Sequence, residues 1–263
     1  MKHSYPQPKV FVVMPAYNAA GTLRLTYRDM PRDRVHTVIL VDDNSSDETL
    51  EVARQLGLES FIHDRNYGYG ANQKTCYREA LKGGADIVVM LHPDYQYDPK
   101  LIPEMIQPIL EQRADVVLGS RLMGVNPVSH GMPWWKYIAN RVLTTLENIV
   151  FGLRLSEYHT GYRAYSRKAL ESVNFEMNSD AFVFDQEIIA QFVQAKQRII
   201  DIAVPTRYFK AASSISFVRS VRYGLSILWV LTRFLLHRSH LLRQRSLDSL
   251  AMRYVARQGK SAV

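Results

Sequence analysis

The residues that could perform chemistry begin with the stretch LHPDYQYDP at 91–99. It follows the apolar run DIVVM at 86–90, a pattern typical of a buried strand. An acidic residue directly after such a strand can hold a metal ion over the phosphates of a nucleotide, because hard cations prefer oxygen ligands. These sites usually use two carboxylates, but Asp94 has His92 where its partner would stand. The stretch therefore indicates a metal site that has either been altered or been lost.

Polar residues follow three further apolar runs: PAYN at 15–18, the acidic stretch DDNSSDET at 42–49, and GSR at 119–121. Each has an ordinary explanation, since Pro and Asn form turns and acidic residues favour the first turn of a helix. Asp42 and Asp43 are harder to explain in this way, because a charge directly beyond a buried strand costs free energy unless a partner uses it. Four such clusters at four strand ends indicate one shared functional site.

Alternating strand-like and helix-like segments would position these clusters. The expected strands lie at 10–14, 36–41, 60–64, 86–91 and 115–120, with a last strand and its exit at 199–209. The first of them is a continuous apolar run, typical of a strand buried on both faces. The expected helices lie at 19–29, 46–57, 69–84 and 99–113. This alternation predicts an α/β fold with a mainly parallel central sheet flanked by helices. Ligands of such sheets bind beyond the carboxyl ends of the strands, which is where the four clusters fall.

Five segments of the chain resemble one enzyme family. They are VVMPAYNAAGTL, ILVDDNSSDET, RNYGYGANQKT, GSR and HTGYRAYSRKAL. Through them, residues 10–210 resemble the family 2 inverting glycosyltransferases of the GT-A fold, in the branch that includes dolichol-phosphate mannose synthase and other polyprenyl-phosphate glycosyltransferases. The resemblance implies a GT-A nucleotide-sugar-binding fold. It also implies an enzyme that moves a sugar from a UDP- or GDP-linked donor to an acceptor, with inversion at the anomeric carbon.

The resemblance further implies how the donor is bound. Tyr17 would pack on the base, Asp43 would accept hydrogen bonds from the base or the ribose, and Arg121 would lie near the diphosphate or the acceptor phosphate. The implied donor-binding residues are Pro15, Tyr17, Asn18, Val41, Asp43, Pro93, Asp94 and Arg121.

The family's metal motif is Asp-x-Asp, followed two residues later by Gln in the lipid-phosphate branch. Asp94 matches the second Asp and Gln96 matches the Gln, whereas His92 departs from the first Asp. The implied cofactor is a divalent cation, Mg²⁺ or Mn²⁺, that bridges the two donor phosphates and neutralises charge on the leaving diphosphate. His92 could ligate the cation, contact a phosphate as a cation itself, face away, or merely end the strand. Asp94 is the expected ligand in each case.

Two further segments are implied at the acceptor side. TGYR at 160–163 matches a family segment under the acceptor site and makes Arg163 a catalytic candidate together with Arg121; Glu157 stands where this branch often has Asp. Asp185 lies where inverting relatives carry a general base, which removes the proton of an acceptor hydroxyl. A lipid phosphate is already an anion, so with that acceptor Asp185 would instead position the sugar or the acceptor. It could also be an acid favoured at a helix N-terminus.

The positive charge of the chain is concentrated in its C-terminal part. The formal net charge is +8, but residues 207–263 contain eleven Lys and Arg and one acid, Asp248, so that the other 206 residues carry a net charge of −2. A nucleic-acid-binding protein would carry basic residues among its core elements, so this distribution argues against nucleic acid as a partner. It favours a local contact with an anionic surface, and a membrane is the leading candidate.

The basic segment contains the apolar stretch SISFVRSVRYGLSILWVLTRFLLHRSHLL. Only ten uncharged residues lie between Arg222 and Arg233, whereas a helix that spans a bilayer needs about 20 apolar residues. Arg219, Arg222 and Arg233 share one side of a helix, which suits a helix lying in a membrane interface with its cationic side toward the headgroups. The alternative is a helix that packs on the body of the protein or on a second copy of the chain.

The chain is therefore expected to divide into a leader at 1–9, a GT-A glycosyltransferase domain at 10–215 and a basic amphipathic helical tail at 216–263. Arg207 and Lys210, just before the tail, could contact phosphates from a loop.

The N-terminus lacks the apolar segment of a signal peptide, and the lone Cys76 excludes an intrachain disulfide. Both features favour the cytoplasm, with peripheral attachment to the cytoplasmic face of a membrane. A polyprenyl phosphate is the preferred acceptor. A saccharide or other hydroxyl acceptor, a nucleotide-sugar-binding protein with a degenerate metal site, and a homo-oligomer remain open.

Overall fold

The structure is a computed structural model that describes residues 7–124, 127–128, 132–206 and 217–248. Most of the expected leader, the last fifteen residues of the expected tail, and the phosphate-contact candidates Arg207 and Lys210 lie outside the described residues. The boundary expected at 215 and 216 also lies outside them and stays a prediction.

A seven-stranded sheet forms the centre of the molecule, with the strand order β3-β2-β1-β4-β6-β5-β7. Strands β1 to β4 are parallel to one another, β5 is parallel to β7, and β6 is antiparallel to both of its neighbours. The strands are β1 (Val10–Ala16), β2 (Thr37–Asp42), β3 (Glu59–Ile62), β4 (Ile87–Met90), β5 (Val116–Ser120), β6 (Arg163–Ser166) and β7 (Ile199–Ala203).

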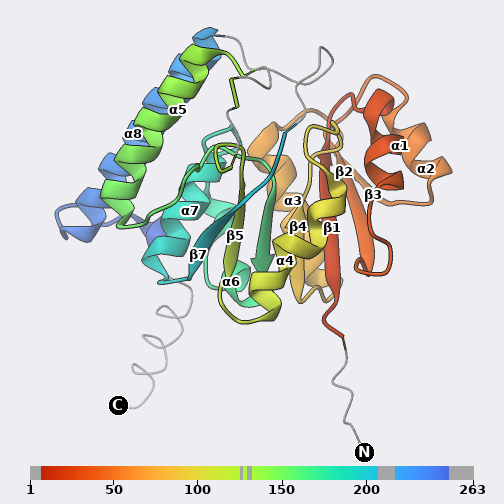
Figure 1. The fold of residues 1–263 in the computed structure, drawn as a ribbon, viewed down its shortest axis with the longest axis horizontal. Coiled ribbons are helices and arrows are strands. Elements are labelled where there is room, and N and C mark those ends of the chain that lie inside the picture. The colour runs from red at the N-terminus through yellow and green to blue at the C-terminus, as the bar shows by residue number, and fades with distance from the viewer. Residues whose placement is uncertain (1–6, 125–126, 129–131, 207–216, 249–263) are drawn as a thin grey trace, which may run out of the picture.

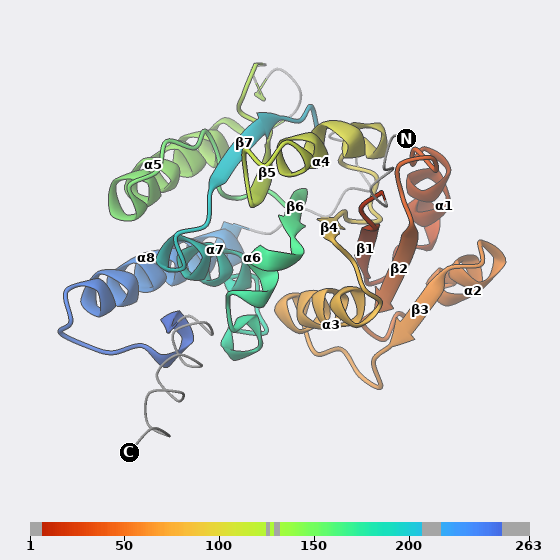
Figure 2. The same ribbon diagram turned by 90° about the horizontal axis from the view of Figure 1, so that it is seen from below.

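Helices cover both faces of this sheet, as Figure 2 shows. One face packs against α1 (Ala20–Arg28), α2 (Thr49–Gln55) and α4 (Ile102–Leu110). The other packs against α3 (Tyr69–Lys82), α6 (Arg167–Glu171) and α7 (Phe184–Gln194). Both faces are buried because β1, β2, β4 and β5 are largely apolar strands whose side chains alternate between the two cores. The predicted α/β fold with a mainly parallel sheet is confirmed.

Two elements that matter for the site were not expected from the sequence. Strand β6 has four residues and pairs through Arg163 with Met90 of β4 and Leu118 of β5. Because β6 is antiparallel, its first residue lies at the edge where its parallel neighbours end. The second element is the helix α5 (Trp134–Phe151), which lies beside α8 (Phe217–Arg238) at one side of the molecule.

Helix α8 packs on α7 and α5 and buries Ile227, Val230, Leu231 and Phe234. The expectation of a helix packed on the body is therefore met by this side of α8. Among the described residues, no helix combines the length and the apolar character needed to cross a bilayer.

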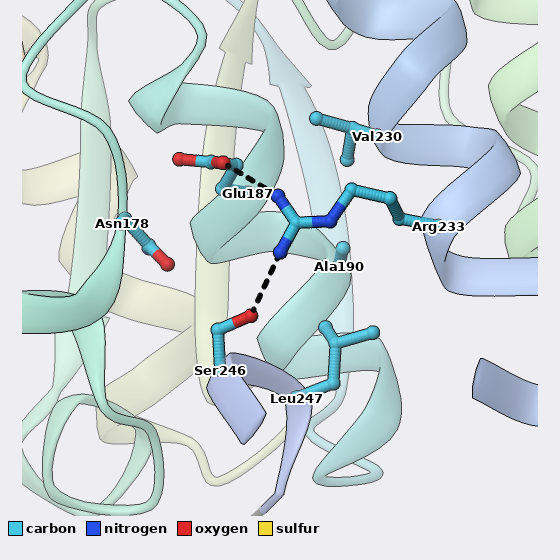
Figure 3. Close-up of a pocket in the computed structure, with 7 residues that line it drawn as sticks. All are labelled: Asn178, Glu187, Ala190, Val230, Arg233, Ser246 and Leu247. Atoms are coloured by element: carbon cyan, nitrogen blue, oxygen red, sulfur yellow. Dashed lines mark hydrogen bonds and ion pairs between the residues drawn. The ribbon is translucent and has the colours of Figure 1, made fainter. Parts of the chain in front are cut away.

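Arg233 does not point outward, whereas Arg222 on the same helix is exposed. Nη1 of Arg233 lies 3.5 Å from Oε1 of Glu187 on α7, and its Nε donates to Gln244 at 3.0 Å. Figure 3 shows its guanidinium in a small pocket between α7, α8 and the segment around Ser246. The expectation that Arg233 faces headgroups is therefore wrong, because a half-buried carboxylate of the body offers it a partner.

We expect the Glu187→Gln variant to change how stability depends on pH. Burial raises the pKa of the Glu187 carboxyl above 4.5, the value of an exposed glutamate, although a hydrogen bond from the Ser179 N–H and the charge of Arg233 oppose this. A raised pKa stabilises the folded protein below the unfolded value, and this contribution is lost as the pH rises through the folded-state pKa. The melting temperature of the wild type, relative to that of the variant, should therefore fall as the pH rises above 4.5.

Glu104→Gln, at an exposed position of α4, controls for the loss of one charge. A wild type that gains stability relative to Glu187→Gln over the same range would contradict the prediction and show that the pairing with Arg233 outweighs burial.

Candidate active site at the carboxyl edge of the sheet

The predicted donor-binding residues lie at the carboxyl edge of the sheet. Pro15 and Val41 are buried in the paired ends of β1 and β2, whereas the Tyr17 side chain just beyond β1 is 55% exposed. Asn18 connects the loop after β1 to the loop after β2, because its Oδ1 accepts a hydrogen bond from the Ser46 N–H at 2.9 Å. An exposed aromatic ring beside a fixed strand end is suited to pack against a base.

Asp43 is a buried carboxylate that holds the loop after β3. It accepts hydrogen bonds from the backbone N–H groups of Tyr67 and Gly68, each at 2.9 Å, and from Nδ1 of His63 at 2.7 Å. Nε2 of His63 lies 3.0 Å from Oγ1 of Thr75 on α3. The ring thus links Asp43 to α3, a role for His63 that sequence reasoning missed.

Asp94 and Gln96 follow β4 on a loop that is held to α1. The Asp94 carboxylate is half-buried and accepts the Gln96 N–H at 3.1 Å, and Oγ1 of Thr26 donates to the Pro93 carbonyl at 3.1 Å. The structure thus places Pro93, Asp94 and Gln96 together directly after the strand, as the motif predicts.

His92 lies between Tyr69 and Gly161. Its ring stacks on that of Tyr69 with an interplanar angle of 9°, and its Nε2 is 3.3 Å from the Tyr69 hydroxyl. A Cβ atom at Gly161 would come within 2.5 Å of the His92 ring, so the glycine is needed for this position. Burial lowers the pKa of the His92 imidazole, although the charges of Asp94 and Asp185 oppose this. A neutral imidazole does not fit the expectation of a cation that contacts phosphate.

The donor set around Asp94 fits a cation shared with the substrate better than one held by protein alone. Among the described residues, no three or more His, Cys, Asp or Glu side chains come together as a metal site. Mg²⁺ bound to nucleotides commonly takes one or two carboxylates and completes its shell with phosphate oxygens and water. The Asp94 carboxylate and the Gln96 carboxamide, two residues apart on this loop, supply oxygen atoms of the kind that such a cation takes.

Asp185 lies at the start of α7 and is surrounded by donors. It accepts hydrogen bonds from the Tyr69 hydroxyl and from Nε2 of Gln73, both at 2.9 Å, and it pairs with Nη1 of Arg163 at 3.2 Å. Burial is the main cause of a pKa for Tyr69 well above its usual value, which keeps the hydroxyl a donor. Tyr69 and Gln73 were missed, although their spacing of four residues puts them on one side of α3.

Arg163 is fully buried beneath this site. Its Nε donates to the Thr160 carbonyl at 2.7 Å, its Nη2 donates to the Tyr158 carbonyl at 3.2 Å, and its Nη1 faces Asp185. A guanidinium without solvent exposure does not touch a substrate in this conformation. Arg163 therefore holds Asp185, which differs from the direct catalytic role expected from the sequence.

Arg121 follows β5 and pairs with the buried Glu157. Its backbone N–H and Nε donate to the two carboxylate oxygens at 2.7 and 2.9 Å, and Nη2 donates to Glu157 and, at 2.8 Å, to the His159 carbonyl. Burial opposes the ionisation of Glu157, but the charge and hydrogen bonds of Arg121 outweigh it and lower the pKa of that carboxyl. Arg121 and Arg163 thus bond to consecutive carbonyls of one loop, those of His159 and Thr160.

These observations define a glycosyltransferase with the GT-A fold. Residues 11–173 match the model of glycosyl transferase family 2, and the chain belongs to this family. The resemblance seen in the sequence is confirmed.

Several relatives act on lipid-linked substrates by their names. The chain is 25% identical over 216 residues to a UDP-N-acetylglucosamine–dolichyl-phosphate N-acetylglucosaminyltransferase of Methanococcus voltae, with 76% of this chain and 86% of the relative covered. It is 23% identical to a polyprenol monophosphomannose synthase of Mycolicibacterium smegmatis, with 76% and 77% covered. Among solved structures, glucosyl-3-phosphoglycerate synthase from Mycobacterium tuberculosis with UDP has a TM-score of 0.64 at 17% identity over 87% of this chain and 80% of that chain, which shows the shared fold.

We expect the Tyr69→Phe variant to be less stable than the wild type by about 1–3 kcal/mol, because it leaves the buried Asp185 with one donor fewer while the ring contacts remain. Urea unfolding measures the difference. Tyr17→Phe is the matched control, since the exposed Tyr17 ring should change stability by less than about 0.5 kcal/mol. Equal stability of Tyr69→Phe and the wild type would show that the hydroxyl does not hold Asp185.

Proposed function

We propose that this enzyme transfers a sugar from a nucleotide donor, with inversion, to a polyprenyl phosphate of the dolichyl type. The observation that supports this acceptor most directly is the state of Asp185. A general base for a hydroxyl acceptor needs a carboxylate that can reach and take a proton. Asp185 is 6% exposed and already accepts from the side chains of Tyr69, Gln73 and Arg163. It is therefore suited to hold these three side chains in place. A phosphate acceptor is an anion and needs no base.

The donor would lie across the strand ends from β2 to β5. In this arrangement Tyr17 packs against the base. Asp43 would accept from the base or the ribose at Oδ2, the oxygen with a single described hydrogen bond, that from the Gly68 N–H. Arg121 lies toward the diphosphate or the acceptor phosphate, where its positive charge attracts the anion. The acceptor phosphate attacks the anomeric carbon from the side opposite the leaving diphosphate, which inverts its configuration.

Asp94 and Gln96 would hold the divalent cation, Mg²⁺ or Mn²⁺, together with the donor. When bound, the cation neutralises charge on the leaving nucleoside diphosphate. His92 supports the loop from its place between Tyr69 and Gly161. Asp94 is then the one carboxylate at the two acidic positions of the motif. A saccharide acceptor is the second candidate, and it would require Asp185 to act as a base.

Calorimetric titration of UDP and GDP, each with Mn²⁺, with Mg²⁺ and with EDTA, tests the donor and the cation. We expect one diphosphate to bind in a metal-dependent way, and Asp94→Ala to weaken it at least about tenfold, or about 1.4 kcal/mol. Asp33→Ala, an exposed acid before β2, is the control and should bind as the wild type does. Binding that is indifferent to metal and to Asp94→Ala would show that no cation is held here and would favour a metal-independent enzyme or a binding protein.

We also propose that the outer faces of α5 and α8 attach the enzyme to a membrane surface. Exposed apolar side chains recur along α5 at Trp134, Ile138, Val142, Leu146 and Ile149. A second row on α8 consists of Val221, Leu225, Leu228, Trp229 and Leu235. The two helices pack side by side, so the two rows lie on neighbouring helices (Figure 1).

The charges on these helices favour an anionic lipid surface, and not another protein, as the partner of the exposed rows. The acid Glu147 of α5 is fully buried and α8 contains no acid, while Arg141 and Arg222 are exposed. Exposed aromatic and aliphatic side chains with flanking cations are typical of interfacial helices, in which the cations contact anionic headgroups. A peripheral position on the cytoplasmic face of a membrane would bring the site to a lipid-linked acceptor.

We expect the protein to float with vesicles that contain phosphatidylglycerol and to do so less at high salt. Leu225→Glu with Trp229→Glu should reduce the bound fraction at least about tenfold, since two inserted side chains of this size contribute about 1.5–3 kcal/mol each. Ile62→Glu, at an exposed apolar position of β3, is the control. A wild type that ignores vesicles but forms a dimer, which Leu225→Glu with Trp229→Glu breaks, would show that a second copy covers this face.

A further inference from the structure

A buried polar network lies beneath α5, on the side opposite its exposed apolar row. It is formed from α5 by Asn140, Thr144 and Glu147, which are spaced by four and three residues and are all buried. Polar side chains are seldom placed on the inner side of a helix unless they bond to one another or to a functional group. Neither the donor site nor the membrane-facing surface uses them.

Asn140 connects α5 to the partner of Arg121. Its Nδ2 donates to Oε1 of Glu157 at 2.8 Å, and Nε and Nη2 of Arg121 donate to the same oxygen. Its Oδ1 accepts from the Thr144 hydroxyl at 3.1 Å and faces Nδ1 of His159 at 3.2 Å. These contacts define the orientation of the amide, because only its nitrogen can donate to the carboxylate.

His159 closes the network from the other side of Arg121. Its carbonyl accepts Nη2 of Arg121 at 2.8 Å, and its Nε2 lies 2.9 Å from Oε2 of Glu147. Within the described part of the chain, Nε2 of His159 and the two Glu147 oxygens have no hydrogen bond of normal geometry, and this close approach of two buried polar groups is the contact that joins the loop to α5 at Glu147.

We propose that Asn140 and His159 are positioning residues for Arg121. Glu157 and the His159 carbonyl both accept from Arg121 and thereby orient its guanidinium. Asn140 sets the place of the first acceptor, and the contact between His159 and Glu147 sets the place of the second. This inference rests on the role proposed for Arg121 at a phosphate. It also means that the surface proposed to meet lipid and the guanidinium proposed to meet phosphate are held by the same helix.

A double-mutant cycle tests the proposal on the full chain, with Asn140→Ala, Arg121→Gln and the double variant. Transfer is measured from the nucleotide sugar whose diphosphate binds in calorimetry to a short-chain polyprenyl phosphate. We expect Asn140→Ala to lower kcat/KM about tenfold or more, as removal of a group that orients a functional side chain commonly does. Asn140→Ala should change kcat and KM in the same proportions as Arg121→Gln does. When Arg121→Gln is already present, adding Asn140→Ala should not lower kcat/KM further.

Thr145→Ala is the matched control, because this exposed hydroxyl on the next turn bonds only to the Arg141 carbonyl among the contacts described for it. Fully additive effects of Asn140→Ala and Arg121→Gln would overturn the proposal. If Asn140→Ala does not fold, Thr144→Val replaces it, since it removes one contact to Oδ1 and should give a smaller loss with the same dependence on Arg121.

The proposal can fail separately from the proposed function. A wild type that transfers no sugar to the polyprenyl phosphate contradicts the function, and the cycle is then read from melting temperatures. Coupling between Asn140→Ala and Arg121→Gln in melting temperature would support the positioning contact, and no coupling would overturn it.

Discussion

The pairing of Arg163 with Asp185 is the interaction on which the candidate site depends. The arginine is fully buried at the first residue of β6, and a buried guanidinium is tolerated only when its donors find partners. Its partners come from two places, the start of α7 and the carbonyls of the loop that precedes β6. Through Asp185 the same contact reaches Tyr69 and Gln73 on α3. Loss of either charge would leave the other buried and would release several elements at once.

The same arrangement explains how a histidine can stand in a motif that usually carries a carboxylate. His92 is stacked on the ring of Tyr69, and the Tyr69 hydroxyl in turn donates to Asp185. A second carboxylate here would lie beside Asp94 and Asp185 in a half-buried place, where like charges repel and each is costly to desolvate. A neutral imidazole avoids that cost. The cluster therefore carries one carboxylate fewer and has a packed support for the loop that carries Asp94.

Helix α5 has two sides with different tasks. Its outer side exposes a row of apolar residues, and its inner side carries polar residues that reach Glu157 and His159. Helix α8 repeats the pattern in part, because it buries Phe234 and turns Arg233 toward Glu187 while it exposes Leu225 and Trp229. Each helix thus packs one side on the body of the protein and exposes apolar residues on its outer side.

The sequence by itself determined the α/β fold, the places of the main strands and the set of residues that follow them. Local signals were sufficient there, because a continuous apolar run marks a strand buried on both faces, and parallel strands bring the residues after them to one edge. It also located the positive charge in the C-terminal part. Asp43, Asp94, Gln96 and Arg121 lie at the predicted edge for this reason.

Only the tertiary structure decided what these side chains do to one another. Strand β6 is too short to stand out in a sequence, and its antiparallel pairing with β4 and β5 exists only between segments far apart in the chain. The same holds for His63 on Asp43, Tyr69 on His92 and Asp185, and Asn140 on Glu157. Residue type and spacing specify which groups are available. Burial and the direction of each hydrogen bond, which depend on distant segments, decide that Arg163 is a support and not a surface cation.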